Sequence, residues 1–298
     1  MTMINTKNPE PKTENRTPST EYPAHISCLQ LIKKAQAEVT RLDAEIMLSY
    51  LLGVQRAGLY IYEGNINNEV LKKFRIFIEE RTEGRPLQYI IGKTEFMGYE
   101  FAVTPDVLIP RPETELLVEK AIEAVKGIKA PVILDLGTGS GNIAIALTKF
   151  ITDCKIIGSD ISKQALFVAK RNARLNQADA DIEFVLSDLF EDLAQTKYNL
   201  IISNPPYVAS PHIRGLKKEI SFEPRIALDG GQDGLDFYRR LIKDSGRFLI
   251  KEGFLMVEVG FDQADEVKTL FKKSGFINIR HILDYNHIKR IVVAQWIG

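Results

Sequence analysis

The stretch that decides the fold reads Val132-Ile133-Leu134-Asp135-Leu136-Gly137-Thr138-Gly139-Ser140-Gly141. Its apolar first half predicts a buried strand, and its glycine-rich second half predicts a tight turn into a helix. Glycines in such a turn let the backbone approach a ligand that a Cβ atom would repel. A pyrophosphate-binding turn normally has the wider spacing G-x-G-x-x-G. The tighter spacing and the acid at the strand end, Asp135, favour a ligand with a zwitterionic amino-acid tail and a sulfonium.

Apolar strands alternate with amphipathic helices from this stretch to the C-terminus. The strands are expected at residues 132–136, 155–159, 182–186, 199–203, 254–259, 277–283 and 290–295. Such alternation predicts parallel strands joined by right-handed crossovers, in a doubly wound α/β sheet. Only residues 284–289 join the last two strands, which is too short for a crossover helix. We therefore expect a mostly parallel seven-stranded sheet with an antiparallel last strand.

Two further acids stand at the ends of predicted strands. Asp160 follows Gly141 by 19 residues and ends the second strand, a position from which a carboxylate accepts both hydroxyls of a ribose. Asp188 follows the third strand and is placed to accept a hydrogen bond from an adenine amino group, although an Asp that merely caps a turn is a nearly equal alternative. Because ligands of open α/β sheets bind at the carboxyl ends of the strands, these acids and the glycine-rich turn predict an adenosyl cofactor.

A second motif, Asn204-Pro205-Pro206-Tyr207, follows the apolar run that ends at Ser203. Both prolines fix φ, so the side-chain carbonyl of Asn204 and the backbone carbonyl of Pro205 form a rigid pair of acceptors. Two acceptors hold a planar NH2 group with its lone pair aimed at a methyl donor, and they stabilise the positive charge that develops on nitrogen. Tyr207 is expected to pack its ring against the flat substrate group. The motif contains no general base, and none is needed before attack.

The chain of 298 residues is long enough for two domains. Its first residues are polar and lack an apolar segment, which predicts disorder. Apolar residues then recur at helical spacing, and an aromatic and β-branched stretch follows that is typical of a hairpin. The expected parts are a disordered tail (1–23), a helical substrate-recognition domain (24–86), a β-hairpin linker (87–108) and a catalytic domain (109–298).

Composition argues against several classes of protein. Lys and Arg total 39, as do Asp and Glu, so we expect no direct nucleic-acid binding. Cys28 and Cys154 form no C-x-x-C motif, which argues against a disulfide framework or a zinc site and favours a reduced, cytoplasmic protein. No apolar run approaches the ~18 residues of a membrane span. The histidines show no ligand spacing, so no metal site is expected, and we expect a monomer.

The chain resembles the HemK/PrmC family of protein-(glutamine-N5) methyltransferases over nearly everything after residue 25. Besides the two motifs above, the resemblance rests on Leu42-Asp43-Ala44-Glu45, Gln88-Tyr89-Ile90-Ile91-Gly92, Ile109-Pro110-Arg111-Pro112-Glu113-Thr114-Glu115, and Phe222-Glu223-Pro224-Arg225 running into Leu228-Asp229-Gly230-Gly231. It implies a class I S-adenosylmethionine-dependent methyltransferase fold with S-adenosylmethionine as cofactor. It also implies that the substrate is the glutamine in the Gly-Gly-Gln loop of class I peptide chain release factors, and that the helical domain helps to grip them.

The resemblance implies roles for single residues as well. Asn204, Pro205 and Tyr207 are expected to hold the glutamine amide. The catalytic and substrate-binding residues are expected to be Asn204, Pro205, Pro206 and Tyr207, with Arg111 and Glu223 as further substrate-binding residues. The cofactor-binding residues are expected to be Asp135, Gly137, Thr138, Gly139, Gly141, Asp160, Ile161, Asp188, Leu189 and Asn204.

Two rival functions share these features. A base methyltransferase presents the same flat NH2 group, but it needs a basic cradle for the nucleic-acid backbone. Residues 26–85 hold nearly balanced charge and no Arg/Lys cluster, which counts against that function. A protein that only senses S-adenosylmethionine would have no use for the Asn-Pro-Pro-Tyr motif.

The chain also contains its own Gly230-Gly231-Gln232, the tripeptide of the presumed target. The flanking Asp229 and Asp233-Gly234 are turn residues that precede a helix expected at residues 235–243. A structural turn is therefore favoured over self-methylation.

Overall fold

A computed structural model describes residues 26–298, so the tail expected at residues 1–23 lies outside the described residues. The chain divides into two compact units, one up to Ile78 and one from Glu79 to Gly298. This division falls inside helix α3 (Asn68–Thr82), whereas the sequence placed the boundary at residue 86.

The described part of the first unit is made of helices. They are α1 (Cys28–Ala35), α2 (Arg41–Leu52), the 3-10 helix η1 (Arg56–Ile61) and the beginning of α3. On α2 the buried carboxylate of Glu45 accepts hydrogen bonds from the Tyr60 hydroxyl (2.6 Å) and from the guanidinium groups of Arg41 (2.8 Å) and Arg56 (3.2 Å). These bonds lower the pKa of Glu45 to about 2 and hold η1 against α2.

Residues 87–91 differ from the hairpin that their composition predicts. They form the short helix α4 (Leu87–Ile91), and only β1 (Lys93–Phe96) and β2 (Tyr99–Ala102) pair as an antiparallel hairpin. The helix begins after Pro86, whose carbonyl accepts hydrogen bonds from two helical N–H groups, and it ends at Gly92 with a left-handed φ of 75°. The prediction was wrong because it weighted apolar β-branched content above these helix start and stop signals.

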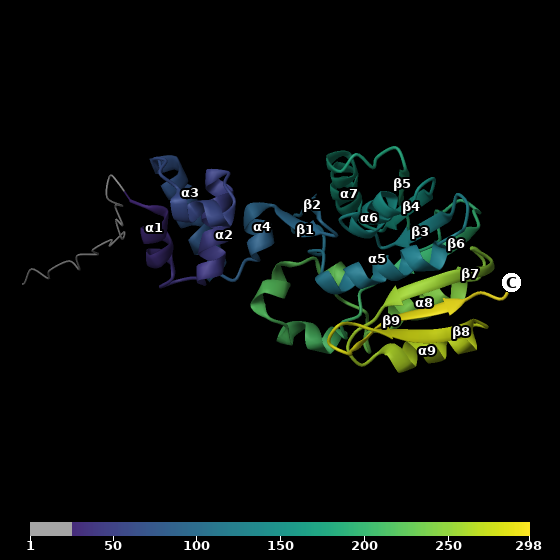
Figure 1. Cartoon of the computed structure of the whole chain (residues 1–298). Helices are drawn as coiled ribbons and strands as arrows, with labels where there is room; N and C mark the ends of the chain where they lie inside the picture. The colour runs from purple at the N-terminus through teal and green to yellow at the C-terminus, as the bar shows by residue number, and fades with distance from the viewer. Residues whose placement is uncertain (1–25) are drawn as a thin grey trace, which may run out of the picture. The chain divides into compact units, whose positions relative to one another are not determined.

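The second unit contains a seven-stranded sheet of order β5-β4-β3-β6-β7-β9-β8 (Figure 1). Its strands are β3 (Val132–Leu136), β4 (Lys155–Asp160), β5 (Ile182–Leu186), β6 (Tyr198–Ser203), β7 (Leu249–Glu258), β8 (Ile277–Leu283) and β9 (Lys289–Gln295). The neighbours from β5 to β7 are parallel, and β9 is antiparallel to both β7 and β8. The predicted mostly parallel sheet with an antiparallel last strand is therefore confirmed.

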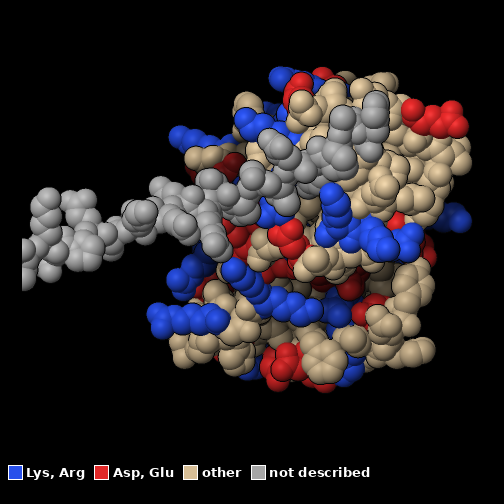
Figure 2. Space-filling view, turned by 90° about the vertical axis from the view of Figure 1, so that its left-hand side faces the viewer, with Lys and Arg blue, Asp and Glu red and all other residues tan. Residues whose placement is uncertain are grey.

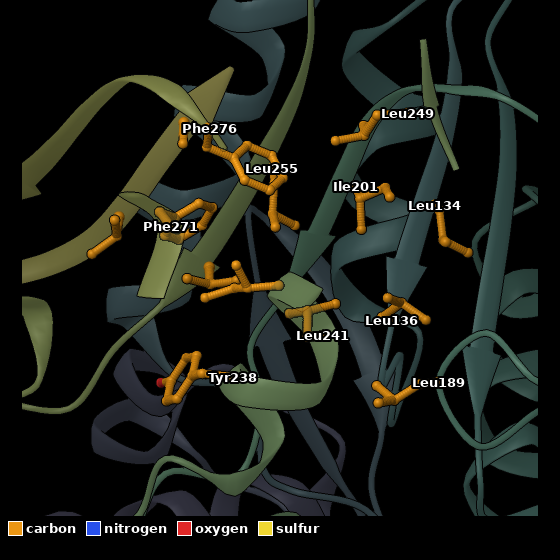
Figure 3. Packing of buried hydrophobic residues seen from close by; sticks show 14 of the residues in the cluster. Leu134, Leu136, Leu189, Ile201, Tyr238, Leu241, Leu249, Leu255, Phe271 and Phe276 are labelled. Carbon is orange, nitrogen blue, oxygen red and sulfur yellow. The ribbon is translucent and has the colours of Figure 1, made fainter. Parts of the chain in front are cut away.

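Helices cover both faces of this sheet because the central strands are apolar on both sides. The helices are α5 (Pro112–Val125), α6 (Asn142–Phe150) and α7 (Lys163–Leu175) on one face, and α8 (Asp236–Ser245) and α9 (Ala264–Lys273) on the other. Successive residues of β3 alternate between these faces: Ile133 packs with α5 and α6, and Leu134 packs with α8. On the second face Phe271 and Phe276 meet edge to face, with ring centroids 5.1 Å apart (Figure 3).

Charged side chains of both signs are mixed on the surface. On the face drawn in Figure 2, Lys and Arg are interspersed with Asp and Glu, and the described residues form no continuous basic area there. Among residues 26–298, no helix combines the length and the apolar character that crossing a membrane requires.

Asn172 on α7 ties the hairpin to the glycine-rich turn. Its side chain is fully buried, and its Nδ2 donates to the carbonyls of Ala102 on β2 (3.0 Å) and Ser140 in the turn (2.9 Å). Its Oδ1 accepts a hydrogen bond from the Ala102 N–H (2.7 Å). One amide therefore satisfies three buried backbone groups.

We expect Asn172→Ala to lower the free energy of unfolding by about 2 to 4 kcal/mol, because removing one partner leaves buried polar groups unpaired. Asn176→Ala, at the residue that caps the end of the same helix, is the matched control, since the bonds of Asn176 lie nearer the solvent. Urea unfolding monitored by circular dichroism measures both variants. Equal losses in the two variants would contradict a special role for Asn172.

Candidate active site

A cavity of about 700 Å³ lies at the carboxyl ends of the parallel strands. The turns that follow β3, β4, β5 and β6 all contribute to its wall. Of the residues expected to bind the cofactor, those that line it are Gly137, Thr138, Gly139, Asp160, Ile161, Asp188, Leu189 and Asn204. Asp135 and Gly141 are buried and do not line it.

The glycines of this turn differ in what surrounds them. A Cβ atom added to Gly137, which has a left-handed φ of 72°, would meet no atom within 4 Å, so this face of the backbone is open. A Cβ at Gly141 would lie 3.1 Å from the Ile145 side chain and 3.2 Å from Ala169. Gly137 therefore exposes backbone to a ligand, while Gly141 allows α6 and α7 to pack closely.

Asp135 is a buried carboxyl with one unsatisfied oxygen. Its Oδ2 accepts a hydrogen bond from the Thr138 hydroxyl (2.6 Å), whereas its Oδ1 has no partner among the described residues. The nearby Ser159 hydroxyl is likewise buried without a partner. Burial raises the pKa of Asp135 to about 7, and the charge of Asp160 adds to the rise. Orphaned buried polar atoms beside an open cavity are typical of a site that a ligand completes.

Asp160 is held in place by backbone donors. Its Oδ2 accepts a hydrogen bond from the N–H of Gly139 and its Oδ1 accepts one from the N–H of Ser162, each at 2.9 Å. Burial raises the pKa of this carboxyl, while these two bonds counter the rise. The side chain thus joins the glycine-rich turn to the beginning of α7 and still reaches the cavity wall.

Asp188 has a partner that the sequence did not predict. The guanidinium of Arg240 on α8 lies 2.9 Å from its carboxylate, and both residues line the cavity. The next residue, Leu189, adopts a left-handed φ of 54°, which is costly for a residue with a branched side chain. The Ser187 hydroxyl donates to the Leu189 carbonyl (2.9 Å) and so stabilises this turn.

The turn Asn204-Pro205-Pro206-Tyr207 separates the large cavity from a second one of about 450 Å³. Pro206 lines the large cavity, whereas Pro205 and Tyr207 line the second. Asn204 and Arg111 line both. Asn204 therefore stands where the two cavities meet, with its amide available to groups on either side.

Arg111 and Glu223, both expected to bind substrate, are partners of each other. Their side chains form a close ion pair, in which Glu223 is almost completely buried and Arg111 is one-third exposed. Glu223 also accepts a hydrogen bond from the Ile109 N–H (3.3 Å). This ion pair connects the segment before α5 to the loop after β6. Arg111 lines both cavities, whereas Glu223 lines only the second.

The chain's own Gly230-Gly231-Gln232 packs against the Asn-Pro-Pro-Tyr turn. A Cβ at Gly230 would lie 2.8 Å from the Pro206 carbonyl oxygen, so only glycine permits this approach. The Gly230 N–H donates to the Val208 carbonyl, and Gln232 is exposed at the tip of the loop. Gln263 adds a further tie, because its Nε2 donates to the Tyr207 carbonyl (2.9 Å).

Thr114 and Glu258 are site residues that the sequence reading missed. The Thr114 hydroxyl donates to Glu258 Oε2 (2.7 Å) and accepts a hydrogen bond from Asn204 Nδ2 (3.0 Å). Both side chains are buried. Glu258 ends β7, so an acid at the carboxyl end of an apolar strand was the signal that could have identified it, as it did for Asp160.

The sheet with its antiparallel β9 and the cavity at its carboxyl edge define a class I methyltransferase that uses S-adenosylmethionine. Two family models match the chain, Methyltransferase small domain over residues 112–220 and PrmC N-terminal domain over residues 27–92. The chain belongs to the family of release factor glutamine methyltransferases.

Sequence relatives establish this membership. The release factor glutamine methyltransferase of Geobacter sulfurreducens is 41% identical over 257 residues, which cover 86% of this chain and 89% of that protein. The one from Aquifex aeolicus is 36% identical over 272 residues, covering 91% of this chain and 96% of that protein. A methyltransferase crystal structure from Pyrococcus furiosus shares the fold, with a TM-score of 0.51 and 15% identity over 76% of this chain and 99% of that one.

The residues of the large cavity fit S-adenosylmethionine. The open backbone at Gly137 accommodates a ligand, and the Ser159 hydroxyl on the cavity wall has no partner among the described residues, as in a site that a ligand completes. The volume of about 700 Å³ is within the usual range for cofactor sites. When bound, the cofactor supplies a sulfonium-activated methyl group.

We expect Asp135→Asn to gain stability relative to the unaltered protein as pH rises. A carboxyl whose pKa is raised from 3.8 to about 7 on folding is ionised first in the unfolded chain, so its contribution to stability is lost between those pH values. The difference in melting temperature, measured without cofactor, should therefore grow from about pH 4 to about pH 7 and then level. Asp181→Asn, at an exposed position, is the matched control. A difference for Asp135→Asn that is constant with pH would contradict the raised pKa.

Proposed function

We propose that this enzyme transfers a methyl group from S-adenosylmethionine to the side-chain amide nitrogen of the glutamine in the Gly-Gly-Gln loop of class I release factors. The observation that carries the proposal is the position of the Asn204–Tyr207 turn between two cavities. A cofactor in the large cavity and a glutamine side chain in the second would meet at Asn204. The names of the relatives supply the substrate class, since each is a release factor glutamine methyltransferase.

The turn itself performs the catalysis in this proposal. An amide nitrogen is a poor nucleophile because its lone pair is delocalised into the carbonyl group. The Asn204 Oδ1 and the Pro205 carbonyl each accept one hydrogen from the glutamine NH2 group, which fixes the plane of the amide and directs its lone pair at the methyl group. The same two oxygens stabilise the charge that develops on nitrogen. Pro205 and Pro206 keep the acceptors rigid, and the Tyr207 ring packs against the amide plane.

The cofactor would be held by the remaining residues of the large cavity. The backbone of Gly137, Thr138 and Gly139 would receive its amino-acid tail, with Asp135 and Gly141 shaping the turn from behind. Asp160 would accept hydrogen bonds from the ribose, because its carboxylate reaches the wall at the end of β4. Ile161, Asp188 and Leu189 would surround the adenine, as their common position on the wall supports.

The helical domain before residue 87 and the hairpin after it are proposed to help position the release factor. The mixed charge of the face in Figure 2 suits a protein partner better than a nucleic-acid backbone, which requires a basic surface. Cys28 and Cys154 are unpaired, which suits a cytoplasmic enzyme. We also propose that the enzyme acts as a monomer.

Asn204→Ala should lower the rate of methyl transfer about 100- to 1000-fold, as expected when one preorganised donor or acceptor at the reacting group is lost. Affinity for S-adenosylmethionine should change little. The assay incubates unmethylated release factor with enzyme and cofactor, and mass spectrometry follows the gain of one methyl group on the Gly-Gly-Gln glutamine.

Two controls accompany this assay. A release factor with that glutamine changed to alanine should gain no methyl group, and Asn286→Ala, which alters an exposed turn between β8 and β9, should keep full activity. No methylation of the release factor by the unaltered enzyme, with cofactor binding intact, would overturn the proposed substrate. Methylation of a nucleic-acid amino group instead would point to a base methyltransferase.

Asp160→Ala should weaken the binding of S-adenosylmethionine about 10- to 100-fold, because a charged hydrogen-bond acceptor contributes about 1.5 to 3 kcal/mol. Isothermal titration calorimetry measures the dissociation constant. Asp181→Ala removes an acid from the exposed loop before β5 and serves as the control. Unchanged affinity in Asp160→Ala would show that the ribose is held elsewhere.

A further inference from the structure

Asn204, Thr114 and Glu258 are brought together by the register of the sheet and by α5. Ser203 pairs with Val257 in the parallel strands β6 and β7, so Asn204 and Glu258 are the next residues of the two neighbouring strands. α5 packs across these strands, and Thr114 lies in its first turn. The Thr114 side chain is almost completely buried between the other two.

The three side chains form a hydrogen-bond chain with a defined direction. An ionised carboxylate only accepts, so Glu258 Oε2 receives the hydrogen of the Thr114 hydroxyl at 2.7 Å. The hydroxyl oxygen is then an acceptor, and the group 3.0 Å away must be a donor, the NH2 of Asn204. With Nδ2 held by Thr114, Oδ1 occupies the opposite side of the amide.

This direction matters because the two ends of an asparagine amide have nearly the same shape. Rotation by a half turn about the Cβ–Cγ bond exchanges oxygen and NH2 at almost no steric cost, and only hydrogen-bond partners select one orientation. In the exchanged orientation the Asn204 NH2 would face the substrate NH2, donor against donor. The acceptor needed for catalysis would be lost although the residue remained in place.

We propose that Thr114 and Glu258 are positioning residues, which select the orientation of the Asn204 amide that presents Oδ1 to the substrate nitrogen. The inference rests on the role proposed above for Asn204 and extends it to Thr114, which lines the large cavity beside Asn204, and to Glu258, which lines neither cavity. No atom is transferred along this chain, and Glu258 acts only through the direction of the two hydrogen bonds.

The protonation state of Glu258 then controls the site. A protonated Glu258 can donate to Thr114, which frees the hydroxyl hydrogen for Asn204 Oδ1 and permits the exchanged orientation. Burial raises the pKa of Glu258 to about 7, and the Thr114 bond and the charge of Arg290 counter the rise. The other titratable or charged groups that face it are Arg111, Glu113, Tyr207 and Tyr238. The positive end of α5 favours the ionised form.

The test measures single-turnover methyl transfer to a release factor at saturating substrate and cofactor, from about pH 6 to about pH 9. The unaltered enzyme should lose activity as pH falls through about 7, because the directing carboxylate becomes protonated. Glu258→Gln should be slower and should lack this acidic limb. Thr114→Val, which removes the hydroxyl at constant shape, should be about 10- to 100-fold slower with an unchanged KM and unchanged affinity for S-adenosylmethionine.

Thr114→Ser restores the hydroxyl and should recover most of the rate. Thr148→Val, on α6, removes a hydroxyl that bonds only a helical carbonyl and should have no effect. A Thr114→Val enzyme with the full rate, or an acidic limb unchanged in Glu258→Gln, would overturn the inference. If Glu258→Gln does not fold, the pair Thr114→Val and Thr114→Ser still decides. Failure of the unaltered enzyme to methylate the release factor would instead overturn the proposed function itself.

Discussion

The site depends on the parallel pairing of β4, β3, β6 and β7, which brings four strand ends to one edge of the sheet. The register fixes which residues meet there: Leu136 pairs with Ser159, and Ser203 pairs with Val257. Asp160, Asn204 and Glu258 each stand at or just after the end of an apolar strand, while helices α5 and α8 add Thr114 and Arg240. Packing on both faces of the sheet therefore fixes the geometry of the cofactor wall and of the Asn-Pro-Pro-Tyr turn together.

The order of the strands and the residues at their ends could be predicted because they depend on local patterns. The apolar run before Gly137 and the one before Asn204 each predict a buried strand, and the glycine or proline residues that follow each run predict a turn. The signals of α4 are equally local: Pro86 precedes its first residue and Gly92 follows its last. The helix was nevertheless not predicted, because the apolar and β-branched composition of residues 87–91 favours a strand. The bonds Asn204–Thr114 and Thr114–Glu258 join residues 90 and 144 positions apart, and no local pattern contains such a pairing.

The Gly-Gly-Gln tripeptide of this chain has a structural role, unlike the methyl-accepting role proposed for the same tripeptide in release factors. Gly230 is required because the Pro206 carbonyl approaches it too closely for any side chain, and Gly234, with a left-handed φ of 77°, is approached still more closely by the Tyr207 carbonyl. These glycines pack against the Asn-Pro-Pro-Tyr turn. The sequence correctly favoured a turn at this place, but only the packing shows that this turn contacts the Asn-Pro-Pro-Tyr segment.

Asn172 gives the structure a mechanical property. Its side-chain amide forms hydrogen bonds both to the β2 backbone and to the Ser140 carbonyl. One buried side chain therefore links the hairpin to the glycine-rich turn. Any event that loosens the hairpin must weaken the turn that faces the cofactor. Thermodynamic linkage makes the relation reciprocal: the free energy by which an ordered hairpin favours cofactor binding equals the free energy by which bound cofactor favours the ordered hairpin.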